Sequence, residues 1–375
     1  MVIFYFGADK PAAELERYGF KRRNTILLRS LSGNNEVSRL VCFNYTSRRI
    51  FFKNFFINYA ETGKKIKDVF FSDLFVFGRF KIGLLNRFFN RIYFQPLKNR
   101  YAREGVLGWI YWPNGYMDYK QTGLNLEFVF DADHNLIDDP NLEAAQKGEL
   151  VNLLKEISNR SKLVVCASKS MLEWFLKNGA RQVYRLRNGI DLSRFKKNRE
   201  SPSKKFSVVY CGILSNWVNY DFFVDLIEKN PDIDFVIIGK SFLNDSYNRL
   251  KTFANVVFLG EKSADEVASL LPGFDAGIAL YKSDTTLDGD SMKIYEYLAA
   301  GLPVVCTNYH SSLKQDFENL LFVGETFEEI NGLLKAIKND SICFDKESVR
   351  LFLERSGWDN RINGVMNVLN TRASL

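Results

Sequence analysis

The chain has 375 residues, of which 46% are hydrophobic and 25% are charged, and its net charge is +7. At roughly 150 residues per domain this length suggests two domains, and the hydrophobic share excludes global disorder. No apolar run reaches the roughly 18 residues of a transmembrane helix, and the N-terminus reads as a strand and not as a signal peptide. Five widely spaced cysteines without a CxxC pair and only two histidines argue against a disulfide framework and a zinc site, and they fit a reducing compartment.

The positive charge is concentrated in the first part of the chain. Residues 1–105 contain 20 Lys or Arg and 8 Asp or Glu, a net +12, so the remainder carries −5. Residues 48–103 contain 13 basic residues, 3 acidic residues and 12 Phe. Interleaved rings and cations suit an anionic bilayer, where each basic residue contributes about 1 kcal/mol; alternatively, the Phe residues fill a core and the charges face solvent. No recognition motif for nucleic acid is present, so no nucleic-acid partner is expected.

Strands and helices are predicted to alternate through the first half. The predicted strands are 2–6, 40–43, 107–112, 126–130, 163–167 and 183–186, and the predicted helices are 11–32, 115–122 (a short helix or turn), 141–159 and a helix from the cap Ser168 to Asn178-Gly179. Residues 48–103 are predicted to hold two or three short helices broken near Gly63, Gly78 and Gly83.

The same alternation restarts after a polar stretch at 196–206, which contains a proline and is the best linker candidate. Strands are predicted at 207–210, 235–238, 256–259, 276–280 and 303–306, and helices at 220–229, 264–271 and 291–300. Such alternation implies an α/β fold of two Rossmann-like doubly wound domains facing each other across a cleft. Ligands in these folds bind beyond the carboxyl ends of the strands, where Gly212, Gly239 and Gly260 follow.

The segment 288–307, DGDSMKIYEYLAAGLPVVCT, carries the most chemistry. It predicts a loop running into a helix N-terminus, where free N–H groups and the helix dipole attract an anion. Ser291 and Lys293 add a hydroxyl and a cation that suit a diphosphate. Glu296, one turn further on, can accept hydrogen bonds from two neighbouring sugar hydroxyls. The alternative is a helix whose Lys and Glu simply face water.

This segment resembles the donor-binding signature of GT-B glycosyltransferases, particularly bacterial group 1 members, from Lys293 to Val305. Supporting similarities are Asn188-Gly189-Ile190-Asp191, Tyr210-Cys211-Gly212-Ile213-Leu214 and the terminal Ser356-Gly357-Trp358-Asp359. The likeness is strong over about 160–375 and weak over 1–110. The run around Trp217 and Ser291-Met292-Lys293 leans toward the branch resembling the xanthan glucuronosyltransferase, which inverts.

The resemblance implies a domain plan and a donor site. The plan is an acceptor domain at 1–195, the linker 196–206, a nucleotide-sugar donor domain at 207–355 and a C-terminal helix, 356–375, that returns to the first domain. The implied donor-site residues are Gly212, Trp217, Gly239, Gly260, Tyr281, Asp288, Ser291, Met292, Lys293 and Glu296. Asp288 stands where many retaining members have Glu, so the stereochemistry stays open.

An inverting reaction needs a base to deprotonate the acceptor hydroxyl. The loop Phe130-Asp131-Ala132-Asp133-His134 follows a first-domain strand, and Asp131 is the favoured base, with Asp133 and His134 as competitors. Alternatively, these acids only cap the next turn. Asp131-Ala132-Asp133 also matches the DxD metal motif of GT-A enzymes, but DxD recurs at 232–234 and 288–290, so we expect no metal.

The implied function is a metal-independent glycosyltransferase without a cofactor. It would move a sugar, from a UDP-sugar by preference, to a lipid-linked glycan acceptor in surface polysaccharide assembly. We expect it to be cytoplasmic and peripheral on the inner face of the membrane, held through residues 48–103. The alternatives are a nucleotide-sugar 2-epimerase on the same scaffold and a binding module without catalysis.

Overall fold

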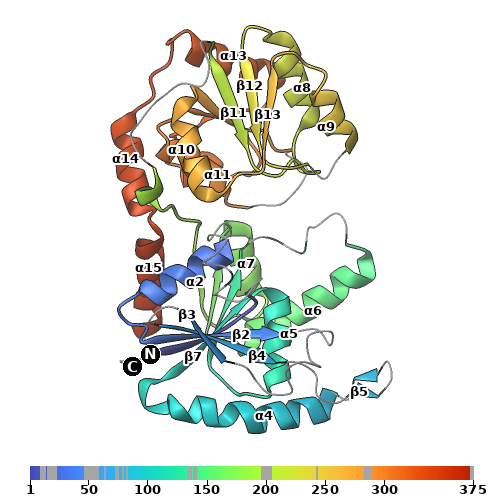
Figure 1. Cartoon of the computed structure of the whole chain (residues 1–375), viewed down its shortest axis with the longest axis vertical. Coiled ribbons are helices and arrows are strands. Elements are labelled where there is room, and N and C mark those ends of the chain that lie inside the picture. Colours follow the sequence, from blue (N-terminus) through green and yellow to red (C-terminus); the bar gives the residue numbers. More distant parts are fainter. Residues whose placement is uncertain are drawn as a thin grey trace. The chain divides into compact units, whose positions relative to one another are not determined.

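The structure, a computed structural model, divides into two compact units (Figure 1). It describes residues 1–8, 14, 23–45, 59–62, 65–71, 76–77, 80–81, 83–133, 135, 137, 142–195, 205–241, 244–282 and 289–371. Unit 1 comprises Met1–Ile137, Leu142–Arg187 and Arg361–Leu375, and the described residues of unit 2 are those of Asn188–Asn360. Asn188–Phe195 belong to unit 2, where Ile190 N donates to Ser356 O at 3.0 Å. Most of the predicted linker lies outside the described residues.

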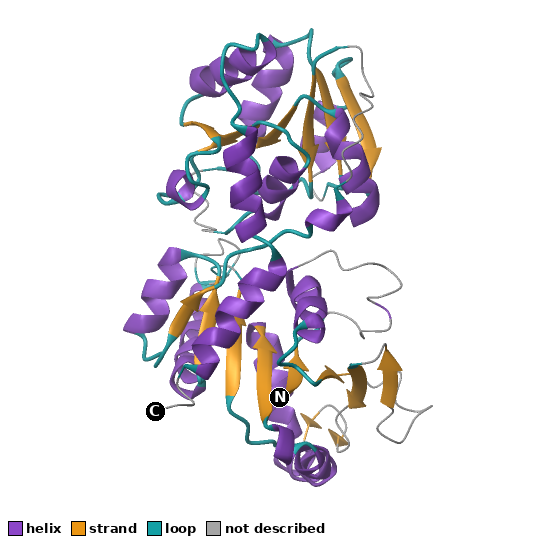
Figure 2. Cartoon of the chain, turned by 90° about the vertical axis from the view of Figure 1, so that its left-hand side faces the viewer, coloured by secondary structure: helices purple, strands orange, loops and turns teal. Residues whose placement is uncertain are grey.

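Unit 1 is built on one sheet of order β10-β9-β8-β7-β1-β2-β4-β3. All neighbouring strands are parallel except β3 and β4. The strands are β1 (Val2–Phe6), β2 (Arg39–Tyr45), β3 (Tyr59–Thr62), β4 (Ile66–Phe71), β7 (Val106–Tyr111), β8 (Phe128–Ala132), β9 (Leu163–Cys166) and β10 (Val183–Arg185). The central strand β1, VIFYF, is buried throughout because helices cover both faces of the sheet (Figure 2).

The helices of unit 1 follow the strands they connect. They are α2 (Arg23–Gly33), α4 (Gly83–Arg100), α5 (Trp112–Thr122), α6 (Ala144–Arg160), α7 (Lys169–Lys177) and most of α15 (Trp358–Asn370). Ser168 caps α7 as predicted, since its hydroxyl accepts from Met171 N at 3.2 Å. Within the described residues, no helix is both long and apolar enough to cross a membrane.

Residues 48–103 contradict the prediction of several short helices. Their described part holds β3, β4, the hairpin β5 (Val76–Phe77) and β6 (Phe80–Lys81), and the single long helix α4. β4 joins the main sheet beside β2, with Phe43 opposite Val69. The sequence of β4, IKDVFF, has no clear period of two or of 3.6, so local pattern does not distinguish a strand from a helix, and the long-range pairing with β2 makes it a strand.

Aromatic rings fill the core of unit 1. The Phe43 ring stacks on Phe6 at 4.6 Å between centroids and contacts Phe4 at 5.1 Å and Phe94 of α4 at 5.3 Å. Phe94 is fully buried and holds α4 against the sheet. Part of the Phe content of 48–103 is therefore core, as the alternative interpretation proposed.

Unit 2 carries a second, fully parallel sheet of order β13-β12-β11-β14-β15-β16. Its strands are β11 (Ser207–Cys211), β12 (Asp234–Ile238), β13 (Val256–Gly260), β14 (Ala276–Ala279), β15 (Val304–Thr307) and β16 (Phe322–Gly324). Its helices are α8 (Tyr220–Lys229), α9 (Asn244–Leu250), α10 (Ala264–Leu270), α11 (Met292–Ala299), α12 (Leu313–Asp316), α13 (Phe327–Lys338) and α14 (Lys346–Arg355). Two doubly wound α/β units confirm the predicted Rossmann-like fold class.

Helix starts in unit 2 are fixed by local sequence. Thr326 and Glu329 form a capping box on α13, and Ser263 and Glu266 form one on α10. Ser291, at the start of α11, is different because its side chain makes no capping hydrogen bond. Its hydroxyl is therefore available to groups outside the helix.

Candidate functional site

The carboxyl edge of the unit 2 sheet is lined by glycines. Gly212, Gly239 and Gly260 lie at the ends of β11, β12 and β13 with φ of 139°, 138° and 69°. Gly212 N donates to Ile238 O and Gly239 N to Gly260 O, both at 2.8 Å. A Cβ on Gly239 would lie 2.0 Å from Gly212 O, so no other residue fits. The predicted glycines thus form one edge of bare backbone that a ligand can approach closely.

Lys293 projects from the first turn of α11 onto this edge. Its Nζ lies 3.1 Å from where a Cβ on Gly212 would be, and 3.9 Å from the centroid of the Tyr210 ring. It lies 5.2 Å from the Tyr281 ring. Burial opposes the charge of Lys293, but Tyr210 and Tyr281 outweigh it and raise its pKa. The edge therefore holds a permanent cation between two aromatic rings.

The N-terminus of α11 brings further predicted groups to the same place. The Ser291 hydroxyl lies 2.9 Å from the Tyr281 hydroxyl, and Met292 is the first helical residue. Ile294 N turns back to Ser291 O at 3.2 Å, which tightens the first turn. Polar hydroxyls, the helix dipole and the Lys293 ammonium converge, an arrangement that stabilises an anion.

Glu296 lies one turn beyond Lys293 on the same side of α11. Burial raises the pKa of Glu296 to about 7, although Lys293 and Arg194 pull it down. The side chain is only partly exposed, so its carboxylate has few competing water molecules. Such a carboxylate can accept two hydrogen bonds from a diol.

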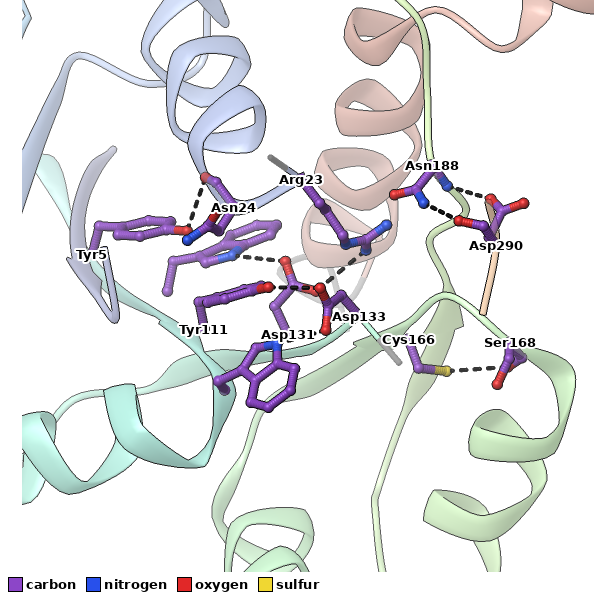
Figure 3. Close-up of polar contacts among 12 residues, drawn as sticks. Tyr5, Arg23, Asn24, Tyr111, Asp131, Asp133, Cys166, Ser168, Asn188 and Asp290 are labelled. Carbon is purple, nitrogen blue, oxygen red and sulfur yellow. Dashed lines mark hydrogen bonds and ion pairs between the residues drawn. The ribbon is translucent and has the colours of Figure 1, made fainter. Parts of the chain in front are cut away.

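Asp290 ties the loop before α11 to the start of unit 2. Asn188 N donates to Asp290 Oδ2 at 2.6 Å, and the Asn188 side-chain amide donates to the Asp290 carbonyl (Figure 3). Tyr295 OH donates to the same carboxylate at 2.9 Å. The first residues of unit 2 and the anion-binding turn are thus held by one carboxylate.

Two other predicted donor-site residues have different outcomes. Trp217 is 39% exposed, and its carbonyl accepts from Lys282 N at 2.9 Å, next to Tyr281. Asp288 lies outside the described residues, as does His134 of the first-domain loop.

The carboxyl edge of the unit 1 sheet carries a buried ion pair. Asp131, at the end of β8, has no exposed surface, and Arg23 donates to its Oδ1 at 3.2 Å (Figure 3). Trp109 Nε1 donates to Oδ2 at 3.4 Å. Burial raises the pKa of Asp131 to about 6, against the pull of Arg23. Both oxygens of the favoured base are therefore occupied by protein groups.

Asp133 is the more accessible of the two described carboxylates. It is partly exposed, and it accepts from Tyr111 OH at 2.6 Å and Trp112 Nε1 at 2.5 Å (Figure 3). Trp112 has φ of 64°, a strained value for a bulky residue. Strain of this kind concentrates at functional sites, where it holds a side chain in a defined direction.

Several site residues were missed from the sequence. The sequence did contain an indication for Tyr210, because this residue belongs to the segment around Gly212 that carries the family resemblance. The sequence contained no such indication for Arg23, because Lys21-Arg22-Arg23 looks like a run of exposed basic residues. Among the described residues, no cluster of three or more His, Cys, Asp or Glu could hold a metal ion.

Comparison with known proteins identifies the second unit. The family model described as "Glycosyl transferases group 1" matches residues 192–342. The matched residues all lie within unit 2, which is therefore similar to the group 1 glycosyltransferase domain. A protein named as a teichuronic acid biosynthesis glycosyltransferase, TuaH of Bacillus subtilis (strain 168), is 25% identical over 214 residues. That alignment covers 50% of this chain and 54% of TuaH, so it spans about half of the relative.

Solved structures share the fold along the whole chain. HepE of Anabaena, solved in complex with UDP and glucose, gives a TM-score of 0.67 at 15% identity, covering 100% of this chain and 99% of HepE. Sucrose-phosphate synthase from Thermosynechococcus elongatus gives 0.70 at 12% identity with the same coverage. These likenesses confirm the predicted GT-B fold, and the family match confirms the predicted group 1 glycosyltransferase type. Membership of the xanthan glucuronosyltransferase branch stays a prediction.

Proposed function

We propose that the chain transfers a sugar from a UDP-sugar to a lipid-linked glycan acceptor during assembly of a surface polysaccharide. The observation that carries the proposal is the Lys293 ammonium, set at the α11 N-terminus directly over the Gly212 backbone. A diphosphate placed there gains a fixed cation and helix amides without side-chain obstruction. As the sugar leaves, charge develops on the diphosphate, and the same groups stabilise it.

The remaining groups of the donor edge fit the rest of the nucleotide sugar. Glu296 would accept hydrogen bonds from the ribose hydroxyls, and Gly260 would leave room for the base against the backbone. Uridine as the base is supported by HepE, whose structure was solved with UDP and glucose. Surface glycan as the product class is supported by the name of TuaH.

The acceptor side belongs to unit 1 in this proposal. If the reaction inverts, Asp133 takes the acceptor proton, because it is the described carboxylate that solvent reaches. Asp131 would then orient the edge through its pair with Arg23, and it remains the alternative base. The Tyr111 and Trp112 donors hold the Asp133 carboxylate in one orientation.

A peripheral location on the cytoplasmic face of the membrane completes the proposal. The net charge of +12 over residues 1–105 complements the negative surface potential of the cytoplasmic leaflet. A lipid-linked acceptor would be met at that surface.

Donor binding tests the proposal directly. We expect UDP-glucose, but not GDP-mannose, dTDP-glucose or a CMP-sugar, to raise the melting temperature. Lys293→Ala should weaken UDP-glucose binding in calorimetry about 10- to 150-fold, from the loss of a charge-assisted hydrogen bond of about 1.5–3 kcal/mol. Lys335→Ala, an exposed lysine of α13, is the matched control. No stabilisation by any of the four donors would overturn the donor site.

Product analysis separates transfer from the other activities. Release of UDP that depends on an added glycan acceptor supports transfer, and NMR of the new linkage gives its stereochemistry. An isomerised nucleotide sugar without UDP release would indicate an epimerase. Donor binding with neither product would indicate a binding module.

A further inference from the structure

The helix α4 packs along one side of unit 1 (Figure 1), and its exposed surface carries apolar and basic side chains. Phe88, Ile92 and Tyr93 are 59%, 53% and 53% exposed, and they are among the most exposed large hydrophobic residues described. Arg87 and Arg91 are exposed beside them at the same four-residue spacing. Side chains four apart lie on one face of a helix, so Phe88 and Ile92 form one row and Arg87 and Arg91 the neighbouring row. Tyr93, five residues after Phe88, lies on another side of the helix.

The opposite side of α4 fixes the helix to unit 1. Phe94 and Leu97 are buried there, and Asn90 Nδ2 donates to Gln121 O at 2.9 Å. Lys98 Nζ donates to Asn125 O at 2.7 Å. Because the helix is held from behind, exposure of Ile92 is a property of the folded surface and not of a frayed end.

The charge of this helix has a single sign. The sequence GLLNRFFNRIYFQPLKNR, residues 83–100, contains four basic residues and no acidic residue. A second copy of the same face would oppose like charges, which disfavours self-association. An anionic partner is favoured instead.

A basic depression of about 620 Å³ adjoins the C-terminal end of α4. Lys98 lines it, together with Arg160, Lys162 and Arg181 from the segments around β9, and with Glu127. Glu127 pairs with Lys162 at 2.8 Å, so the lining keeps an excess of positive charge. A depression of this kind suits a phosphate group near the end of the helix.

We propose that the exposed face of α4 docks on an anionic lipid bilayer. Ile92 and the Phe88 ring enter the interface, Arg87 and Arg91 meet lipid phosphates, and the basic depression takes a further headgroup. Exposed Ile92 favours a bilayer over a nucleic acid, which offers its apolar faces only to rings. This inference narrows the peripheral location proposed above to one helix, and it rests on that location but not on the donor site.

Vesicle flotation tests the docking face. We expect the full chain to float with vesicles of 30% phosphatidylglycerol in phosphatidylcholine, not with pure phosphatidylcholine, and to bind less at 500 mM than at 50 mM salt. Arg87→Gln/Arg91→Gln should lower partitioning about 25-fold, about fivefold per cation. Ile92→Ser should lower it about tenfold.

Matched controls come from unit 2. Leu351→Ser changes an equally helical, 40% exposed apolar residue, and Arg249→Gln/Lys251→Gln removes two exposed cations. Both should leave flotation unchanged, and all variants should bind UDP-glucose like the unchanged chain in the absence of vesicles. Intact UDP-glucose binding without flotation would overturn the docking face alone.

A nucleic-acid partner is the alternative outcome. Tight binding to single-stranded polynucleotide that is lost in Arg87→Gln/Arg91→Gln, but not in Ile92→Ser, would overturn the bilayer proposal. Failure of UDP-glucose binding with normal flotation would overturn the donor site and leave the docking face standing.

Discussion

The sheets of the two units end in carboxyl edges of opposite character. In unit 2 the edge is glycine backbone with Lys293 set over it. In unit 1 the corresponding edge is crowded by ionisable and aromatic side chains, with Asp131 buried against Arg23 and Asp133 held by Tyr111 and Trp112. An edge of exposed backbone can bind any ligand that carries a diphosphate. An edge of closely packed side chains is complementary to one partner.

This difference explains the uneven family resemblance. A backbone edge needs glycines at fixed places, and that requirement leaves a readable pattern in the sequence. An edge made of side chains can be built from many residue combinations, so it leaves no fixed pattern in the sequence.

Breaking the buried pair should have the largest effect on the unit 1 edge. Asp131→Asn leaves the Arg23 cation buried without its carboxylate, and we expect a loss of about 3–5 kcal/mol in the free energy of unfolding. Urea denaturation at pH 8 measures it, where Asp131, with its pKa of about 6, is ionised.

Asp133→Asn is the control for this pair, because Asp133 is partly exposed and should cost about 1 kcal/mol. It should abolish inverting transfer while UDP-glucose still binds. Equal stability losses in both variants would contradict the distinction between a buried structural acid and an accessible one.

Filling the glycine edge of unit 2 should come next. Gly239→Ala combines a positive φ with a Cβ 2.0 Å from Gly212 O, and we expect a loss of about 3 kcal/mol. Gly260→Ala also has a positive φ but meets nothing within 4 Å, so it should cost only about 1 kcal/mol. Thermal unfolding of both variants measures the two losses of stability. Equal losses would show that the positive φ, and not the contact of the new Cβ with Gly212 O, determines the cost.

The smallest expected effect is a pH dependence at Glu296. Its pKa is raised to about 7, so the carboxylate is protonated below that pH and loses acceptor capacity for the ribose diol. UDP-glucose affinity should therefore rise about tenfold from pH 6 to pH 8. Calorimetry measures this pH dependence. UDP-glucose is the ligand to use, because UDP itself has a terminal phosphate that ionises near pH 6 and would add a second pH dependence.

Glu296→Gln is the corresponding control and should flatten the profile. The raised pKa also means that the contribution of Glu296 to folding stability is greatest below about pH 4.5 and is lost as the pH rises through 7. A pH-independent affinity in the unchanged chain would contradict the assigned role.

Much of the fold could be predicted from sequence. Strands such as β1 and β12 are short apolar runs that end near glycine, and the Ser168 cap of α7 is a local signal. The segment 48–103 could not be predicted, because β4 joins the main sheet by pairing with β2, a contact distant in sequence, and β3 depends on β4. In the candidate site, Lys293 and Glu296 were readable from spacing, but the burial of Asp131 depends on Arg23, 108 residues away.

Asp290 has a consequence for how this chain can change over evolution. Its carboxylate serves both Asn188, where the chain enters unit 2, and the turn that starts α11. If that turn evolves to bind another activated sugar, either position 290 stays acidic or the contacts of Asn188 change together with the turn. A substitution at position 290 would therefore affect both the turn that starts α11 and the segment at which unit 2 begins.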